Sequence, residues 1–127
     1  MKSKITTGRG DGGKTTSLDG DSFEKNHPRM EAAGALDMLR AQTALLRLQL
    51  QEQYPEDLME TDFLLFLLHL YFLIGTVISD PYMRKPEWRR GEIRKEHLAR
   101  LEQEQGRLES GLNLPASFIV SASNTAA

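Results

Sequence analysis

The chain has 127 residues, a formal net charge of −2 and no cysteine, which predicts one modest domain. The acidic balance, with a pI of about 5.9, argues against a nucleic-acid-binding protein, because such a protein needs a basic face for phosphate. Without cysteine the chain has no disulfide, no thiolate nucleophile and no cysteine zinc site, and its three histidines lack ligand spacing. No apolar stretch follows the charged first residues, so we expect a cytoplasmic protein.

The first segment is rich in glycine and reads Gly8-Arg9-Gly10-Asp11-Gly12-Gly13-Lys14-Thr15-Thr16-Ser17-Leu18. Glycines adopt positive φ, which lets successive backbone N–H groups point into one anion-binding concavity. Lys14 adds a compact positive charge, and the hydroxyls of Thr15 and Thr16 suit phosphate or magnesium. The segment is typical of a triphosphate-binding loop, and its composition is equally typical of a flexible N-terminal tail.

Residues Gly8 to Thr15 also satisfy the P-loop pattern G-x-x-x-x-G-K-[ST]. A P-loop needs a buried strand before it and a helix that begins at the lysine. Here only residues 1–7 precede the loop, and the turn-forming residues 17–22 follow it. We therefore predict phosphate chemistry without the P-loop fold.

A first long helix is predicted from the Asn26-His27-Pro28 start to Gln53, because residues 29–53 contain no proline and only one glycine. Its leucines recur at helical spacing and its alanines allow close packing, so we expect it inside a bundle. Tyr54 to Asp57 form the break, with Asp57 as the N-cap of the next helix.

Residues 63–79 contain no charge, and these 17 residues reach the lower limit for a membrane span. The acidic flanks and the central His69 favour instead a helix buried in a bundle or an oligomer. A membrane span is the alternative. We interpret His69 as a hydrogen-bonded core or interface residue, because no partner ligand stands three or four residues away.

The remaining segments are a connector, a third helix and the start of a fourth. Residues 80–91 are net basic and predict a solvated connector. The third helix runs to about Leu112 with a leucine seam that also permits a short coiled coil. Residues 114–120 are predicted to be extended, and residues 121–127 to begin another helix. The predicted fold is thus all-α, with an irregular glycine-rich loop (1–27) before a helical bundle domain (28–127).

Three segments, in this order, resemble the ATP:cob(I)alamin adenosyltransferases of the PduO type, which are trimeric five-helix bundles. The family loop T-G-D-x-G-x-T-x-L resembles residues 10–18, and K-x-x-x-R-x-E-A-x-G-x-x-D resembles Lys25 to Asp37. The passage Leu-Pro-x-x-Phe-Ile-Leu-Pro-Gly-Gly resembles Leu114 to Val120, although Ser121-Ala122-Ser123 replaces Pro-Gly-Gly. The resemblance covers nearly the whole chain.

The resemblance implies transfer of the 5′-deoxyadenosyl group of ATP to reduced cobalamin by a homotrimer, with release of triphosphate. Cobalt itself is the nucleophile, so the protein positions the reactants and neutralises the leaving group. By resemblance, the residues that bind ATP and Mg²⁺ are Thr7, Gly10, Asp11, Gly13, Lys14, Thr15, Thr16, Lys25 and Arg29. Phe118 packs against the lower face of the corrin; from the residues alone it is a core anchor.

Asp37 matches a family carboxylate that pairs with an arginine of the neighbouring subunit. That arginine belongs to a C-terminal R-R-x-E-R helix, and no arginine follows Arg107 here. We interpret the chain as truncated at its C-terminus, so that Asp37 is a buried carboxylate without its cation, for which the connector from Arg84 to Arg90 is a conceivable substitute. The alternative function is a non-catalytic corrinoid-binding or oligomerisation module. A P-loop nucleotidase and a membrane protein are more distant alternatives.

Overall fold

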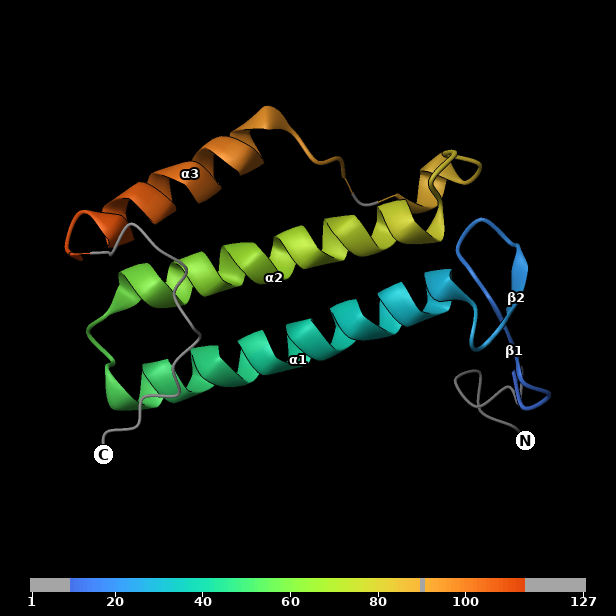
Figure 1. Cartoon of the computed structure of the whole chain (residues 1–127), viewed down its shortest axis with the longest axis horizontal. Helices are drawn as coiled ribbons and strands as arrows, with labels where there is room; N and C mark the ends of the chain where they lie inside the picture. The colour runs from blue at the N-terminus through green and yellow to red at the C-terminus, as the bar shows by residue number, and fades with distance from the viewer. Residues whose placement is uncertain (1–9, 90, 114–127) are drawn as a thin grey trace. The chain divides into compact units, whose positions relative to one another are not determined.

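A computed structural model describes residues 10–89 and 91–113, and the chain divides into two compact units, residues 1–93 and 94–127. The elements are β1 (Lys14–Thr16), β2 (Ser22–Glu24), α1 (Pro28–Gln53), α2 (Leu58–Ser79), the short 3₁₀ helix η1 (Pro86–Trp88) and α3 (Lys95–Glu109) (Figure 1). The three predicted long helices are confirmed. The predicted extended passage at 114–120 and helix start at 121–127 lie outside the described residues.

Helices α1 and α2 form an antiparallel pair in the first unit (Figure 1). Pro28 opens α1 because its fixed φ and missing N–H suit a first helical position. His27 caps this helix, and its Nδ1 accepts the N–H of Arg29 at 3.1 Å. Asp57 occupies the predicted N-cap position of α2, but its side chain makes no capping hydrogen bond. Further along the pair, Arg47 donates from Nε to the carbonyl oxygen of Thr61 at 3.0 Å.

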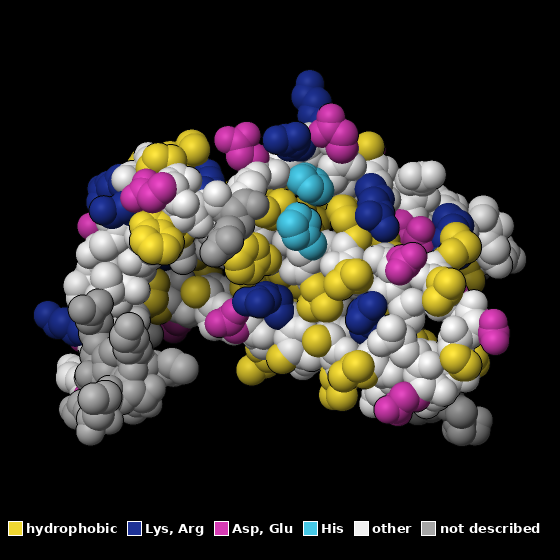
Figure 2. Space-filling view, turned by 180° about the vertical axis from the view of Figure 1, so that it is seen from behind, with side chains coloured by type: hydrophobic (Ala, Val, Ile, Leu, Met, Phe, Trp, Pro, Cys, Tyr) yellow, Lys and Arg dark blue, Asp and Glu magenta, His cyan; other side chains and the backbone are white. Residues whose placement is uncertain are grey.

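The core of this unit is small. Leu70 and Leu73 are 6% and 2% exposed, whereas Leu45 and Leu65 are 57% and 50% exposed. The burial of the first two helices in a bundle or an oligomer stays a prediction, since within the first unit each of them is covered on one face by the other. Within the first unit α1 and α2 pack against each other, and residues 63–79 of α2 carry no charge on any face of the helix. Hydrophobic side chains consequently reach the surface in several places (Figure 2).

Helix α2 is the one helix in the described part of the chain that is long and apolar enough to cross a membrane. Its best window has a mean hydropathy of 1.9. This result rests on length and composition alone, and the core helix of a soluble protein passes the same test.

The predicted irregular loop contains a small antiparallel hairpin. Lys14 pairs with Glu24, Thr15 with Phe23 and Thr16 with Ser22. The β-branched threonines favour the extended backbone, and Gly20 allows the turn because its φ is +90°. Lys14 begins a strand rather than a helix, so the rejection of a P-loop is confirmed.

Helix α3 is the described element of the second unit. It ends at Glu109, slightly before the predicted Leu112. At its start the N–H of Arg94 donates to Nδ1 of His97 at 2.8 Å. Leu98 and Leu108 of the predicted seam are 58% and 49% exposed.

Candidate functional site

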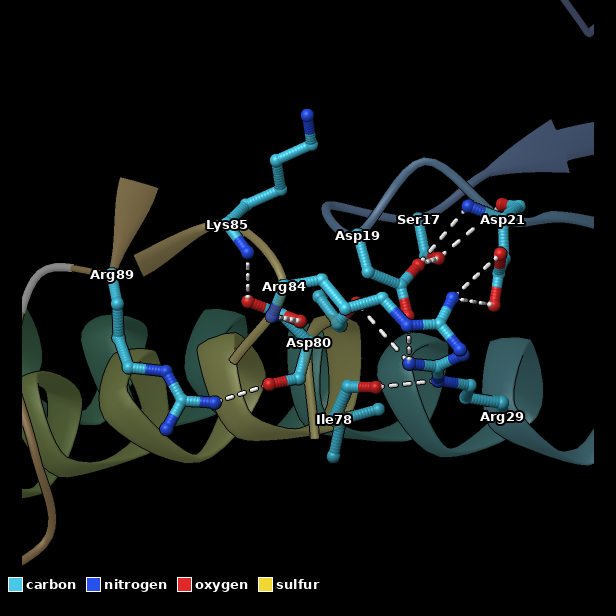
Figure 3. Close-up of polar contacts among 10 residues, drawn as sticks. Ser17, Asp19, Asp21, Arg29, Ile78, Asp80, Arg84, Lys85 and Arg89 are labelled. Atoms are coloured by element: carbon cyan, nitrogen blue, oxygen red, sulfur yellow. Dashed lines mark hydrogen bonds and ion pairs between the residues drawn. The ribbon is translucent and has the colours of Figure 1, made fainter. Parts of the chain in front are cut away.

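The turn between β1 and β2 closes around the carboxylate of Asp19, whose side chain is 1% exposed. Its Oδ1 accepts the hydroxyl of Ser17 and, at 3.1 Å, the N–H of Asp21. Its Oδ2 accepts a guanidinium N–H of Arg29 at 2.8 Å (Figure 3). The Ser17 hydrogen bond, followed by that from Arg29, lowers the pKa of Asp19 to about 2. This buried carboxylate is thus ionised and fully paired.

Arg29 joins the hairpin turn to the end of α2. Its Nε donates to the carbonyl oxygen of Ile78 at 2.6 Å, and its second nitrogen donates to that of Ser79 at 3.2 Å (Figure 3). Carbonyl groups in the last turn of a helix lack intrahelical partners, and the negative end of the helix dipole favours a cation. The N–H of Asp19 also donates to Ser79 at 3.3 Å. Together these bonds hold the turn against α2.

The connector after α2 folds back toward the same turn. The Asp80 side chain accepts the N–H groups of Arg84 at 2.8 Å and Lys85 at 3.0 Å, and Asp80 is fully buried. The guanidinium of Arg84 donates to both carboxylate oxygens of Asp21, each at 3.0 Å. Arg89 donates to the carbonyl oxygen of Asp80 (Figure 3). The predicted solvated connector is confirmed for residues 81–88, which are exposed, whereas Asp80 is buried and Arg89 is half-buried.

The glycines and two lysines of the predicted loop come together at the open end of the hairpin. Gly10 and Gly13 have φ of +101° and +82°, and a Cβ on Gly10 would lie 3.1 Å from the Lys14 carbonyl oxygen. The same Cβ would lie 3.9 Å from the Lys25 ammonium nitrogen. The Gly13 carbonyl accepts the N–H of Lys25 at 3.0 Å. We call this group of Gly10, Gly13, Lys14 and Lys25 the glycine–lysine corner.

The corner is open to solvent. The ammonium of Lys14 lies 3.6 Å from the Glu24 carboxylate, and these side chains are 66% and 62% exposed. An exposed pair of this kind is weak and gives way readily to a more highly charged partner. Asp11 and Thr16 are also exposed, and Thr15 is half-buried. A glycine turn with two ammonium groups has the chemistry of a polyphosphate site.

Two of the predicted site residues lie apart from this corner. Arg29 bonds to the turn of the hairpin, at the end opposite the corner, and its guanidinium is occupied by the internal bonds described above. Asp37 lies on α1 with its side chain 73% exposed, and its Oδ1 accepts Arg40 at 3.1 Å. Thr7 and Phe118 lie outside the described residues.

The expectation of a buried Asp37 without a cation is therefore wrong for the single chain. The face of α1 that carries Asp37 is open, and Arg40 rather than the connector supplies the charge. Asp37 also lines a pocket of about 310 Å³, which is bounded by α1, α2, the hairpin turn and η1. The other residues that line this pocket include Arg40, Phe72 and Trp88.

Sequence reasoning missed the residues that fix the hairpin. Asp19 and Asp21 alternate with Gly20, and this pattern signals a turn. The pattern carries no information about Arg29 or Arg84, which lie 10 and 63 residues from their partners. Asp80 directly follows the uncharged residues 63–79. Its role as an acceptor for two N–H groups depends on the fold of the connector.

Comparison with known proteins places the chain in a family. Residues 5–127 match the family described as Cobalamin adenosyltransferase, and the chain belongs to this family. The resemblance seen in the sequence is thereby confirmed. No curated protein sequence is significantly similar to the chain.

A solved structure shares the fold. It is a variant of the PduO-type ATP:corrinoid adenosyltransferase from Lactobacillus reuteri, complexed with cobalamin and ATP. The TM-score is 0.74 at 19% sequence identity, and the match covers 94% of this chain and 64% of that one. The chain thus spans less than two thirds of the length of the protein whose fold it shares.

Arg29→Lys should destabilise the protein, because a single ammonium cannot satisfy Asp19 and two carbonyl groups in the geometry of the guanidinium fork. We expect the Tm to fall by about 5 °C or more. Arg40→Lys is the matched control on the same helix and should change the Tm little, since the Arg40–Asp37 pair is exposed. Thermal unfolding followed by circular dichroism measures both; equal Tm values would contradict the role of Arg29.

The low pKa of Asp19 makes its contribution to stability depend on pH. When the pH falls, the unfolded carboxyl is protonated near its usual value of 3.8, whereas the folded one stays ionised to about pH 2. Its stabilisation is therefore complete above about pH 5 and is lost as the pH approaches about 2. Asp19→Asn should melt below the wild type at neutral pH, and the gap in Tm should narrow across this acid range. A gap that stays constant would disprove the assignment.

Proposed function

We propose that the chain is a corrinoid adenosyltransferase that transfers the 5′-deoxyadenosyl group of ATP to cob(I)alamin. The observation that carries the proposal is the glycine–lysine corner, since the family's phosphate motif folds there into an exposed cationic turn. The complex of the Lactobacillus reuteri protein with cobalamin and ATP supports these two substrates.

In this reaction a bond forms between Co(I) and C5′ of the ribose, while the C5′–O5′ bond breaks and its electron pair leaves with the triphosphate. No side chain has to attack, so the chain's task is to orient ATP and to balance the departing negative charge. The ammonium groups of Lys14 and Lys25 would bind the triphosphate. Turn N–H groups near Gly10 and Gly13 would add donors.

Magnesium fits this corner as an ion that arrives with ATP. The described residues contain no group of three or more His, Cys, Asp or Glu that could cage a metal. Mg²⁺ is commonly held by one or two carboxylates together with substrate phosphates. Asp11 offers an exposed carboxylate beside the glycine turn, and Thr15 and Thr16 offer hydroxyls.

We further propose that the active form is a cytoplasmic homotrimer with the family's five-helix bundle. The exposed leucines of α1 and α2 support assembly, because packing between copies would remove them from water. The exposed Asp37 is open to an arginine of a neighbouring copy. The proposed parts of Thr7 in ATP binding and of Phe118 against the corrin rest on the family motif.

A non-catalytic corrinoid-binding or oligomerisation module is the second candidate. The exposed apolar face favours it, since that face suits a partner without requiring any chemistry. In that case the corner is not an ATP site, which the following two experiments decide.

Removing either lysine of the corner should weaken ATP binding. A hydrogen bond to a charged group is worth about 1.5–3 kcal/mol, so Lys14→Ala and Lys25→Ala should each raise the Kd for Mg-ATP about tenfold or more. Lys85→Ala is the charge-matched control, because the Lys85 side chain points away from the contacts in Figure 3. Titration calorimetry gives the three constants. Unchanged affinity in both corner variants would contradict the site.

The purified chain should convert cob(I)alamin and Mg-ATP to adenosylcobalamin under anaerobic conditions, with one triphosphate released per product. Absorption spectroscopy follows the corrinoid and ion chromatography follows the triphosphate. Product in the wild type and its loss in the Lys14→Ala, Lys25→Ala double variant would support the enzyme. A folded chain that yields no product, and whose ATP affinity is unchanged in the corner variants, would instead favour the non-catalytic module.

A further inference from the structure

We propose that the connector after α2, residues 80–89, acts as a clasp on the hairpin, and that Arg84 is a positioning residue for the glycine–lysine corner. The clasp closes through the ion pair of Arg84 with Asp21. This inference assigns a function to a segment that the phosphate motif does not include. It rests on the proposed function only where it concerns an anion at the corner.

The connector begins with a turn whose backbone is fixed by Asp80. The buried carboxylate of Asp80 accepts the N–H groups of Arg84 at 2.8 Å and Lys85 at 3.0 Å. Its carbonyl oxygen accepts the N–H of Met83 at 3.3 Å and a guanidinium N–H of Arg89. Met83 has a φ of +52°, which is unfavourable for a residue with a side chain and persists only where surrounding bonds enforce it. The turn therefore presents Arg84 in one defined direction.

From this turn, the Arg84 side chain reaches the carboxylate of Asp21 (Figure 3). Its Nη1 donates to both carboxylate oxygens, each at 3.0 Å. The two side chains are 49% and 45% exposed, whereas those of Arg29 and Asp19 are 17% and 1% exposed. The hairpin turn thus has one buried anchor and one half-exposed anchor. Water can replace the half-exposed pair at little cost, so this is the pair through which the clasp opens.

The hairpin carries the effect of this pair to the corner. Asp21 immediately precedes β2, and its carbonyl oxygen accepts the N–H of Ser17 at 2.9 Å. Lys25 directly follows β2, and its N–H donates to the carbonyl oxygen of Gly13 at 3.0 Å. Strands of three residues have little stability of their own. The geometry of the corner therefore depends on the anchors at the turn.

Hydrogen exchange tests the clasp without any ligand. The reporters are the backbone amides of Ser17 and Lys25 in the hairpin, and the reference is that of Tyr54 at the far end of α1. Arg84→Ala should speed exchange of the two hairpin amides about threefold, the scale of a half-exposed ion pair, and leave that of Tyr54 unchanged. Lys85→Ala removes the same charge from the connector and should change none of the three. Nuclear magnetic resonance of the full chain measures the rates.

Anion binding at the corner gives an effect whose sign identifies its cause. Asp21→Ala removes a negative charge, so a purely electrostatic effect would tighten the binding of tripolyphosphate. Loss of the clasp should instead raise the Kd about threefold, in Asp21→Ala as in Arg84→Ala. Lys85→Ala is again the control and should leave the Kd within about twofold. Titration calorimetry with tripolyphosphate gives these constants, and circular dichroism confirms that each variant folds.

The outcomes separate the clasp from the proposed function. Unchanged hairpin exchange in Arg84→Ala, or unchanged or tighter tripolyphosphate binding in Asp21→Ala, overturns the clasp even if cob(I)alamin is converted. Equal acceleration of all three amides would show that Arg84 contributes only to global stability, which also overturns it. A wild-type chain that binds no tripolyphosphate removes the phosphate site of the proposed function and the positioning role of Arg84, and the exchange rates then decide whether the clasp holds the hairpin.

Discussion

The first unit depends on the guanidinium of Arg29. It bonds to the Asp19 carboxylate and to two carbonyl groups at the end of α2, and so joins the hairpin, the start of α1 and the end of α2. The three acceptors complement one another: the buried carboxylate needs a cation, and the helix end needs donors. The hairpin is only three residues long in each strand, so it has little stability of its own. The bonds of Arg29 therefore hold the hairpin in place, as a larger hydrophobic core would otherwise do.

The charged groups of the hairpin fall into two sets with different roles. At the turn, Asp19 and Asp21 are both paired with arginines from other segments. At the open end, the ammonium of Lys14 meets only an exposed Glu24 at 3.6 Å. The paired set fixes the backbone, and the loosely paired set is available to an anion. A cationic end on a rigid support loses less conformational entropy when it binds an anion than a flexible loop would lose.

Local patterns predicted the helices well, whereas partners distant in sequence could not be predicted. Proline in the first turn and the absence of proline from residues 29–53 predicted the limits of α1, which is Pro28–Gln53. The family motif singled out Asp37, but the exposure of its side chain depends on how many helices cover α1, which a sequence motif does not encode. The bond from Arg84 to Asp21 spans 63 residues, and no local propensity encodes it. The strands were missed because each has three residues, which is too short for the alternation that indicates a strand.

The bonded residues lie far apart in the sequence, and this separation also sets the order in which the parts of the first unit can assemble during translation. The hairpin is the first described part of the chain to leave the ribosome, yet its anchors on Ile78 and Ser79 follow Arg29 by 49 and 50 residues. The Arg84 anchor emerges later still. A nascent chain therefore carries an unfinished hairpin until α2 and the connector have been made, and non-local contacts of this kind form slowly. The hairpin is made before both long helices and gains its anchoring bonds only after them.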